Sequence, residues 1–271
     1  MFKSLLLYEF EKFWSKKMNI VCFIAIPLIV LLSLKFTLES NQLTKVMSPA
    51  FSSNLNFHIT SLQEMLLSAF NAIVIIFCAL SFHEEYRKGN LRSVFVRGIS
   101  IGGLYVAKSV VVAVNIFLVL LLQLNVFILA GLVVLPKVQE AALFFKDGLY
   151  GMNEISLYSV KFYLLAYMSL LAFSSIVEFI SLKCKSITSV IALSLGFLVA
   201  SMLYVIVLGV YFGKGSSILV FQALSIPYVQ FKGSASFAAG ITNMFIYSSA
   251  ILFMFFKLLS YRTFTSKDYL D

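Results

Sequence analysis

Charge, cysteine and histidine are all scarce in this sequence. Charged residues make up 12% of the chain, about half of the share in ordinary soluble domains. The three cysteines, Cys22, Cys78 and Cys184, form no CxxC pair, and we expect no disulfide. The two histidines are His58 and His83, and none follows residue 83. The later helices therefore lack the histidine that a membrane protease or a Ser/His/Asp hydrolase would need there. We therefore assign no catalytic residue, metal ligand or bound cofactor to this chain.

Apolar residues are correspondingly abundant. They make up 61% of the chain, and the mean hydropathy is +0.96. A water-soluble fold cannot hide so much apolar surface, whereas a bilayer accepts it. A spanning helix needs roughly 20 apolar residues, because the hydrocarbon core is about 30 Å thick. We predict an all-α integral membrane protein, a single transmembrane domain over residues 1–271. Its six expected helices cover residues 18–38, 62–82, 109–135, 162–182, 187–212 and 237–259.

Basic residues predict how these helices are oriented. With the N-terminus in the cytoplasm, fourteen Lys and Arg residues fall on the inner side and seven on the outer side. An excess of Lys and Arg in short loops marks the cytoplasmic side of a membrane protein. Both termini are therefore expected in the cytoplasm. The same pattern accounts for the net charge of +9, so no nucleic-acid partner is expected.

Residues 1–17 form an amphipathic pattern ahead of the first apolar run. Phe10, Phe13 and Trp14 can share a broad apolar face, whereas Glu9 and Lys12 lie on another. Such a helix lies in the plane of the membrane surface. Two interpretations stay open: a plain membrane anchor, or an elbow helix that helps to hold a cytoplasmic partner.

Two short motifs fail, and their failure is informative. The glycines of residues 209–215 are spaced one residue too closely for a phosphate-binding loop, and Gly215 stands where Ser or Thr is needed. The chain therefore has no visible ATP site. His83-Glu84-Glu85 begins like a zinc-protease helix, but Arg87 stands where the second histidine should be.

Four polar residues within the expected helices are candidates for a translocation path: Asn71, Asn115, Gln123 and Glu178. Ionised and polar groups inside a membrane indicate function by default. The alternative is structural, because asparagine and glutamine also join helices by hydrogen bonds. Glu178 lies near the inner end of its helix, where it could reach Lys183 or the lipid headgroups.

The segment between the second and third expected helices is charged and amphipathic. Leu91, Val94 and Phe95 follow a helical spacing and form one apolar stripe, whereas Arg92 and Arg97 lie off it. This pattern predicts a short helix parallel to the membrane. The alternative is a simple connector that lies on the membrane surface.

In this segment and in its six-helix layout, the chain resembles the permease subunits of ABC-2-type ATP-binding cassette transporters. In that family an acid precedes Gly-Thr, a short hydrophobic helix, a Pro-Ile-Ser-Arg-like turn and a lysine that opens the third helix. The corresponding residues here are Glu84, Glu85, Gly89-Asn90, residues 91–96, Gly98-Ile99-Ser100 and Lys108. The departures are Asn90 for Thr, Gly98 for Pro and Ile101 for Arg.

The resemblance implies a coupling helix that docks into a separate ATPase subunit, which would bind ATP and Mg²⁺. The residues implied in that contact are Glu84, Glu85, Arg87, Gly89, Leu91, Arg92, Val94, Phe95 and Arg97. It also implies a second permease chain, as a homodimer or heterodimer in contact with membrane lipid. The expected function is export of an amphipathic antimicrobial peptide, toxin or drug across a bacterial plasma membrane, or immunity to such a compound.

Two other functions stay open. An ion-coupled secondary transporter would need several buried acids and interrupted helices near the middle of the membrane. A non-transporting sensor or assembly subunit would need neither, and the sequence does not exclude it.

Overall fold

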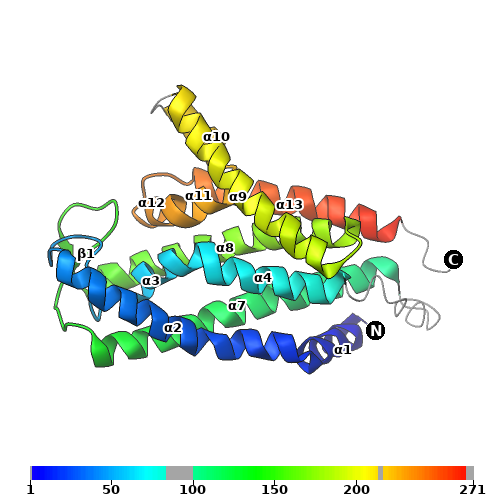
Figure 1. The fold of residues 1–271 in the computed structure, drawn as a ribbon, viewed down its shortest axis with the longest axis horizontal. Coiled ribbons are helices and arrows are strands. Elements are labelled where there is room, and N and C mark those ends of the chain that lie inside the picture. Colours follow the sequence, from blue (N-terminus) through cyan, green and yellow to red (C-terminus); the bar gives the residue numbers. More distant parts are fainter. Residues whose placement is uncertain (1, 84–99, 213–215, 267–271) are drawn as a thin grey trace.

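The computed structural model describes residues 2–83, 100–212 and 216–266 (Figure 1). Within these residues it confirms six helices that are long and apolar enough to span a membrane. They are α2 (Lys17–Leu43), the composite helix Phe57–His83, α7 (Ile101–Val134), α8 (Met152–Lys183), α9 (Ile187–Phe212) and α13 (Met244–Thr265). A helix satisfies its own backbone hydrogen bonds, which is the requirement for crossing lipid.

Several helices are longer than the expected apolar spans. The 34 residues of α7 would extend for about 50 Å, well beyond the hydrocarbon core. The third and fourth helices accordingly begin at Ile101 and Met152, not near residues 109 and 162. Their added turns carry polar residues that are tolerated outside the hydrocarbon, so hydropathy alone places the boundary too far inside.

The expected sixth span, residues 237–259, is wrong at both ends. Phe237 belongs to a separate short helix, and α13 begins at Met244 and continues to Thr265. Gly240 has a φ of +81°, a left-handed conformation that suits glycine and separates the two helices. The apolar residues on both sides of this turn read as one continuous run in the sequence.

Short helical turns connect α9 to α13. They are α10 (Ser216–Gln222), α11 (Ile226–Tyr228), the π-helical segment η3 (Val229–Gly233) and α12 (Ser234–Ala238). We call α11, η3 and α12, residues 226–238, the return segment. It packs against α8 and α13, so it is part of the bundle.

The composite helix Phe57–His83 contains one π-helical segment in its interior and ends in a second. Its parts are α3 (Phe57–Met65), η1 (Leu66–Phe70), α4 (Asn71–Cys78) and η2 (Ala79–His83). A π-helical turn inserts a residue into the regular hydrogen-bond ladder, and such turns are frequent at functional sites.

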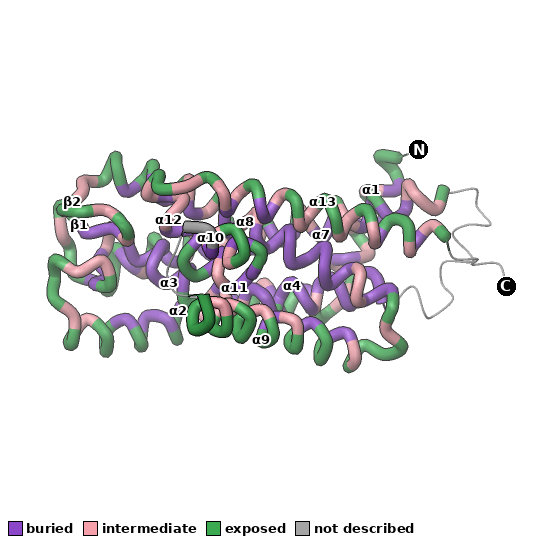
Figure 2. Tube along the Cα trace, turned by 90° about the horizontal axis from the view of Figure 1, so that it is seen from above, coloured by how far each residue is buried: buried purple, intermediate pink, exposed green. Residues whose placement is uncertain are grey.

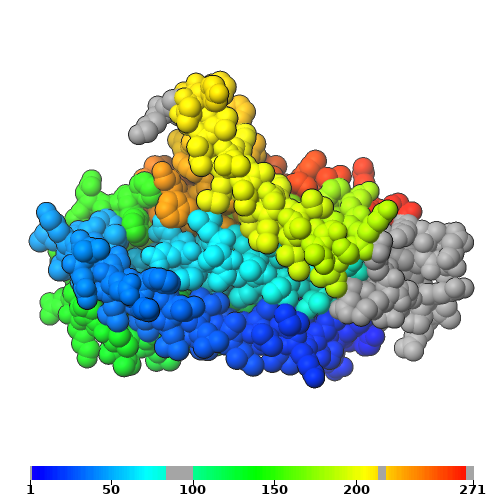
Figure 3. All heavy atoms as spheres, viewed as in Figure 1, coloured from blue at the N-terminus to red at the C-terminus, as the bar shows by residue number. Residues whose placement is uncertain are grey.

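Helix α8 lies at the centre of the bundle, where it packs against α13, α4 and the return segment. Most of the apolar part of α8 is buried. In Figure 2 the buried residues, in purple, gather in the interior of the bundle. Helix α9 is the opposite case: its buried residues are Val190, Ser194 and Leu198. In Figure 3 the end of α9 and α10 rise from the rest of the molecule as a ridge.

The two ends of the bundle differ. Helix α1 (Phe2–Ser15), the end of α13 and the start of α7 lie at one end, which we call the terminal end (Figure 1). The connections 44–56 and 135–151 lie at the other, the loop end. The second of these includes a short hairpin with two residues in each strand, in which β1 (Ala141–Ala142) pairs antiparallel with β2 (Leu149–Tyr150).

Candidate functional site

Ionised side chains lie buried near the terminal end of the bundle. Such a group is costly inside a bilayer unless a partner neutralises it, so its position is a strong functional indicator. One cluster is centred on Glu178 of α8, and a second contact joins α1 to α7 through Glu9 and Lys108. Both connect helices that are far apart in the sequence.

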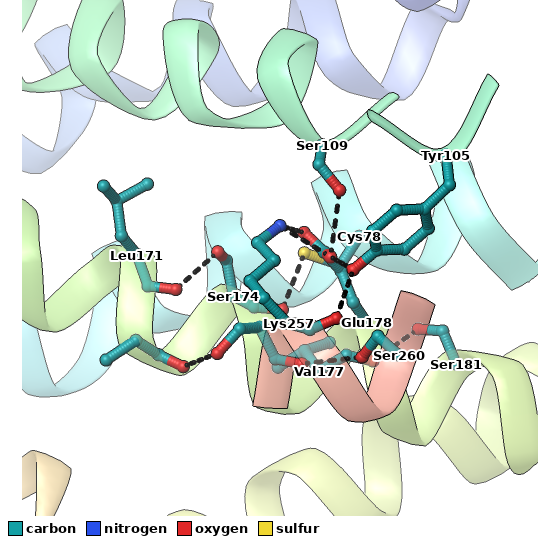
Figure 4. Close-up of polar contacts among 12 residues, drawn as sticks. Cys78, Tyr105, Ser109, Leu171, Ser174, Val177, Glu178, Ser181, Lys257 and Ser260 are labelled. Carbon is teal, nitrogen blue, oxygen red and sulfur yellow. Dashed lines mark hydrogen bonds and ion pairs between the residues drawn. The ribbon is translucent and has the colours of Figure 1, made fainter. Parts of the chain in front are cut away.

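Glu178 is bound by side chains from two other helices (Figure 4). Lys257 Nζ on α13 lies 2.6 Å from Glu178 Oε1 and 2.7 Å from Oε2. From α7, the Tyr105 hydroxyl donates to Oε2 at 3.0 Å, and Ser109 Oγ donates to the same atom at 3.3 Å. The carboxylate therefore joins α7, α8 and α13, and the lysine offsets its charge.

The partner of Glu178 differs from the expected one. Lys183 is exposed, and its Nζ lies 6.0 Å from the centre of the Phe179 ring on the same helix. The sequence alone indicates no partner for Lys257, which lies near the expected cytoplasmic end of the span 237–259. In the structure Lys257 lies within α13 and opposite Glu178, because α13 packs against α8.

A groove between α7 and α13 reaches the lysine side of this pair. It has a volume of about 320 Å³, and Lys257, Tyr105 and Phe253 are among its lining residues. Glu178 is fully buried and does not line the groove, whereas 17% of the Lys257 side chain is exposed. A polar group that entered the groove would therefore meet the cation first.

Serines on α8 allow other helices to approach this cluster closely. Ser174 Oγ donates to the Leu171 carbonyl oxygen at 2.8 Å, and Ser181 Oγ donates to the Val177 carbonyl oxygen at 2.7 Å (Figure 4). These hydroxyls are satisfied within their own helix. Small side chains of this kind favour close helix packing in membranes. Here Cys78 Sγ of α4 lies 3.6 Å from the Ser174 carbonyl oxygen.

The second contact attaches α1 to the start of α7. Lys108 Nζ lies 2.7 Å from Glu9 Oε2, and both side chains are at most 5% exposed. A small cavity of about 10 Å³ lies beside the pair and is also lined by Lys16 and Ser81. The sequence places Glu9 on the polar face of an amphipathic helix, but the structure buries it against Lys108.

Helix α1 also contacts the end of the composite helix. Lys16 Nζ, just after α1, donates to the Leu80 carbonyl oxygen at 2.6 Å within the π-helical segment η2. The rings of Phe13 and Phe77 lie 4.9 Å apart, edge to face. Residue 80 precedes and Lys108 follows the segment 84–99. The N-terminal helix is therefore attached to the chain on both sides of that segment.

The other residues expected along a path are buried but do not share one site. Asn115 Nδ2 donates to the Val111 carbonyl oxygen of its own helix at 2.8 Å. Gln123 Oε1 accepts a hydrogen bond from the Tyr163 hydroxyl of α8 at 2.9 Å. Asn71 pairs with the return segment. Their role in translocation stays a prediction.

The residues expected to contact an ATPase lie outside the described residues. They are Glu84, Glu85, Arg87, Gly89, Leu91, Arg92, Val94, Phe95 and Arg97. The contacts that the sequence analysis missed are those of Lys257, Tyr105 and Glu9. For Glu178 and Lys257, the only signal in the sequence is that both lie near the expected cytoplasmic ends of their spans. That signal does not identify them as a pair.

Comparison with known proteins gives one positive result. Residues 5–150, just over half of the chain, match the family model described as "ABC-2 family transporter protein". No curated protein and no solved structure matches the chain. The matched region includes most of α1 and all of α2, the composite helix and α7, and thus both helices that flank the segment 84–99.

The Glu178–Lys257 pair yields an asymmetric prediction. Lys257→Met should lower stability by about 3–5 kcal/mol, because it leaves a fully buried carboxylate without its cation. Glu178→Gln should cost less, since the partly exposed lysine can turn into the groove. The double variant Glu178→Gln/Lys257→Met should recover much of the loss. The measurement is the melting temperature of the purified protein in detergent.

Lys183→Met is the matched control, because Lys183 is an exposed lysine at the same end of the bundle. Its melting temperature should stay close to that of the unmodified protein. Equal losses for Lys257→Met and Lys183→Met would contradict the assigned role of the pair.

The Glu9–Lys108 contact predicts that charge reversal can be repaired. Lys108→Glu should release α1, because two buried carboxylates would then face each other. Exchanging the charges in Glu9→Lys/Lys108→Glu should restore the attachment. The measurement is the rate at which chymotrypsin removes an N-terminal tag by cleavage near Phe13, since none of these variants adds or removes an aromatic cleavage site. Glu11→Gln, at an exposed position of α1, is the control and should leave that rate unchanged.

Proposed function

The chain belongs to the ABC-2 family of transporter proteins, and we propose that it is the permease subunit of an exporter driven by a separate ATPase. Family membership makes it a multi-pass membrane subunit that works with an ABC ATPase. The observation that carries the proposal is the family match across the first three membrane helices, in a chain with six such helices. ATP and Mg²⁺ would bind to the partner.

The terminal end of the bundle is the side we assign to the cytoplasm. The distribution of lysine and arginine supports this assignment, with fourteen of these residues on the side of the termini and seven on the other. The ATPase is a soluble partner and would approach from this end. The loop end would then face the exterior of a bacterial plasma membrane.

The segment 84–99 is the proposed docking site for the ATPase. Its apolar stripe, Leu91, Val94 and Phe95, would enter a groove of the partner, and the charges around it would pair with charges there. The attachment of α1 on both sides of the segment supports this assignment. A force applied to the segment would reach the composite helix, α7 and α1 together.

The proposed cargo is an amphipathic molecule such as an antimicrobial peptide, toxin or drug. The chain contains 28 Phe and 13 Tyr residues, and the groove between α7 and α13 combines apolar walls with the lysine of a buried ion pair. Such a combination of apolar walls and few polar groups is typical of ligand sites.

A second permease chain would complete the path. Helix α9 has few buried residues, and its end and α10 project from the bundle, so this ridge is the proposed contact with the second copy. The rest of the outer surface would contact lipid.

The first experiment is purification of the tagged chain in mild detergent, with mass spectrometry of its partners. We expect a soluble ABC ATPase in stoichiometric amount. Recovery of an intact, well-folded chain without any ATPase would contradict the proposal and favour an ion-coupled transporter or a sensor.

Phe95→Asp tests the docking site itself. A carboxylate in the apolar stripe should abolish co-purification of the ATPase, because the partner's groove would have to bury an unpaired charge. Membrane insertion should be unaffected. Ser93→Asp is the matched control: it adds the same charge off the stripe and should retain the ATPase. Retention of the ATPase by both variants would show that docking lies elsewhere.

A further inference from the structure

The composite helix and the return segment meet at two π-helical turns. The segment η1 ends at Phe70, directly before Asn71, and the segment η3 contains Gln230. The two segments are in contact, although they lie about 160 residues apart in the sequence. The contact thus lies at an irregular turn of each partner. Either the composite helix or the return segment can bend there.

A reciprocal pair of amides joins them. Asn71 Nδ2 donates to Gln230 Oε1 at 2.8 Å, and Gln230 Nε2 donates to Asn71 Oδ1 at 2.9 Å. Asn71 is 1% exposed and Gln230 is fully buried. Both amides thus satisfy each other in a buried position, and separating them would leave two donors and two acceptors without partners in apolar surroundings.

A second hydrogen bond acts at the same contact. Gln63 Nε2, on α3, donates to the Phe231 carbonyl oxygen in η3 at 2.7 Å. Side-chain contacts therefore hold the return segment both before and after the π-helical turns of η1. Each is directional, so the return segment has one position and register on the composite helix.

The composite helix also leads to the proposed ATPase contact. It ends at His83, immediately before the segment 84–99, and its last turn is the π-helical segment η2. Between the two π-helical segments lies α4, eight residues of regular helix. A displacement of residue 83 would thus be carried through α4 to Asn71.

The return segment borders a groove that such a displacement would reshape. The groove has a volume of about 240 Å³ and lies between Leu67 of η1, Met202 of α9, and Tyr228 and Phe231 of the return segment. The amide pair fixes one wall of this groove relative to another. Its width therefore depends on the pair.

We propose that Asn71 and Gln230 are positioning residues for transport, which make the return segment move together with the composite helix when the ATPase acts. The inference rests on the proposed function, because it needs a partner that drives the helix. The pair transmits the movement toward the loop end, where the groove beside the return segment opens or closes in response.

The test follows the return segment directly in the purified permease–ATPase complex. Lys232, exposed in η3, is replaced by cysteine in a chain whose three native cysteines have been changed to alanine. The rate of labelling by a water-soluble maleimide is measured in lipid nanodiscs, without nucleotide and with ATP plus vanadate. We expect the two rates to differ in the otherwise unmodified chain.

The decisive variant is Asn71→Leu/Gln230→Met. Replacing both partners with apolar side chains of similar size leaves no unpaired buried group, so the protein should fold and bind the ATPase. It removes the directional link, however, and we expect the nucleotide-dependent difference in labelling to fall by about tenfold, within the usual range of coupling between sites. The exchanged pair Asn71→Gln/Gln230→Asn should retain most of the difference.

Asn125→Leu is the matched control, since Asn125 is an exposed asparagine of α7 bonded to its own helix. A double variant that folds, binds the ATPase and keeps the full labelling difference would overturn the inference. So would equal rates with and without nucleotide in the chain that carries only the cysteine changes. Failure of that chain to bind any ATPase would instead contradict the proposed function.

Discussion

Water is absent from the interior of a bilayer, and this constraint shapes the whole chain. Every backbone polar group there has to find a partner within the protein, and an unpaired polar side chain is costly. The backbone meets the requirement by forming helices, and many buried side chains meet it by bonding to their own helix or to a neighbouring one. The contacts of Glu178 with Lys257, of Glu9 with Lys108 and of Asn71 with Gln230 are three solutions of the same problem. Because each joins elements distant in sequence, polar satisfaction also fixes tertiary structure.

The number and type of the membrane-spanning elements could be predicted from composition alone. Six apolar runs gave six helices, because each run is long enough to span the hydrocarbon and a helix satisfies its own backbone hydrogen bonds there. The helix ends were less predictable, since a helix such as α7 continues past the hydrocarbon into polar surroundings. The error at residues 237–259 has a different cause. Glycine adopts the left-handed turn at Gly240 without steric strain. The apolar residues on both sides of the turn make the sequence look like one continuous span.

The partners of the polar residues were not predictable from one sequence. Hydropathy identifies Glu178 and Asn71 as unusual, but the residue opposite each depends on helix rotation and register. Lys257 illustrates the difficulty: as a lysine near the end of an apolar run, it has the same pattern as any cytoplasmic flanking cation. Only the packing of α8 against α13 shows that it neutralises a carboxylate. The burial of Glu9 is equally specific to the position of α1 on α7.

The composite helix carries polar attachments along its entire length. Near the terminal end, the Leu80 carbonyl oxygen accepts from Lys16; farther along, Asn71 pairs with Gln230; and near the loop end, Gln63 donates to the return segment. Apolar contacts alone would let a helix slide or rotate in lipid, because the bilayer is as apolar as its neighbours. Directional hydrogen bonds remove that freedom at particular residues, and the π-helical segment η1, between Gln63 and Asn71, restores a limited capacity to bend. A helix held in this way can pass a displacement from one side of a membrane toward the other, which is the mechanical property that an ATP-driven permease requires.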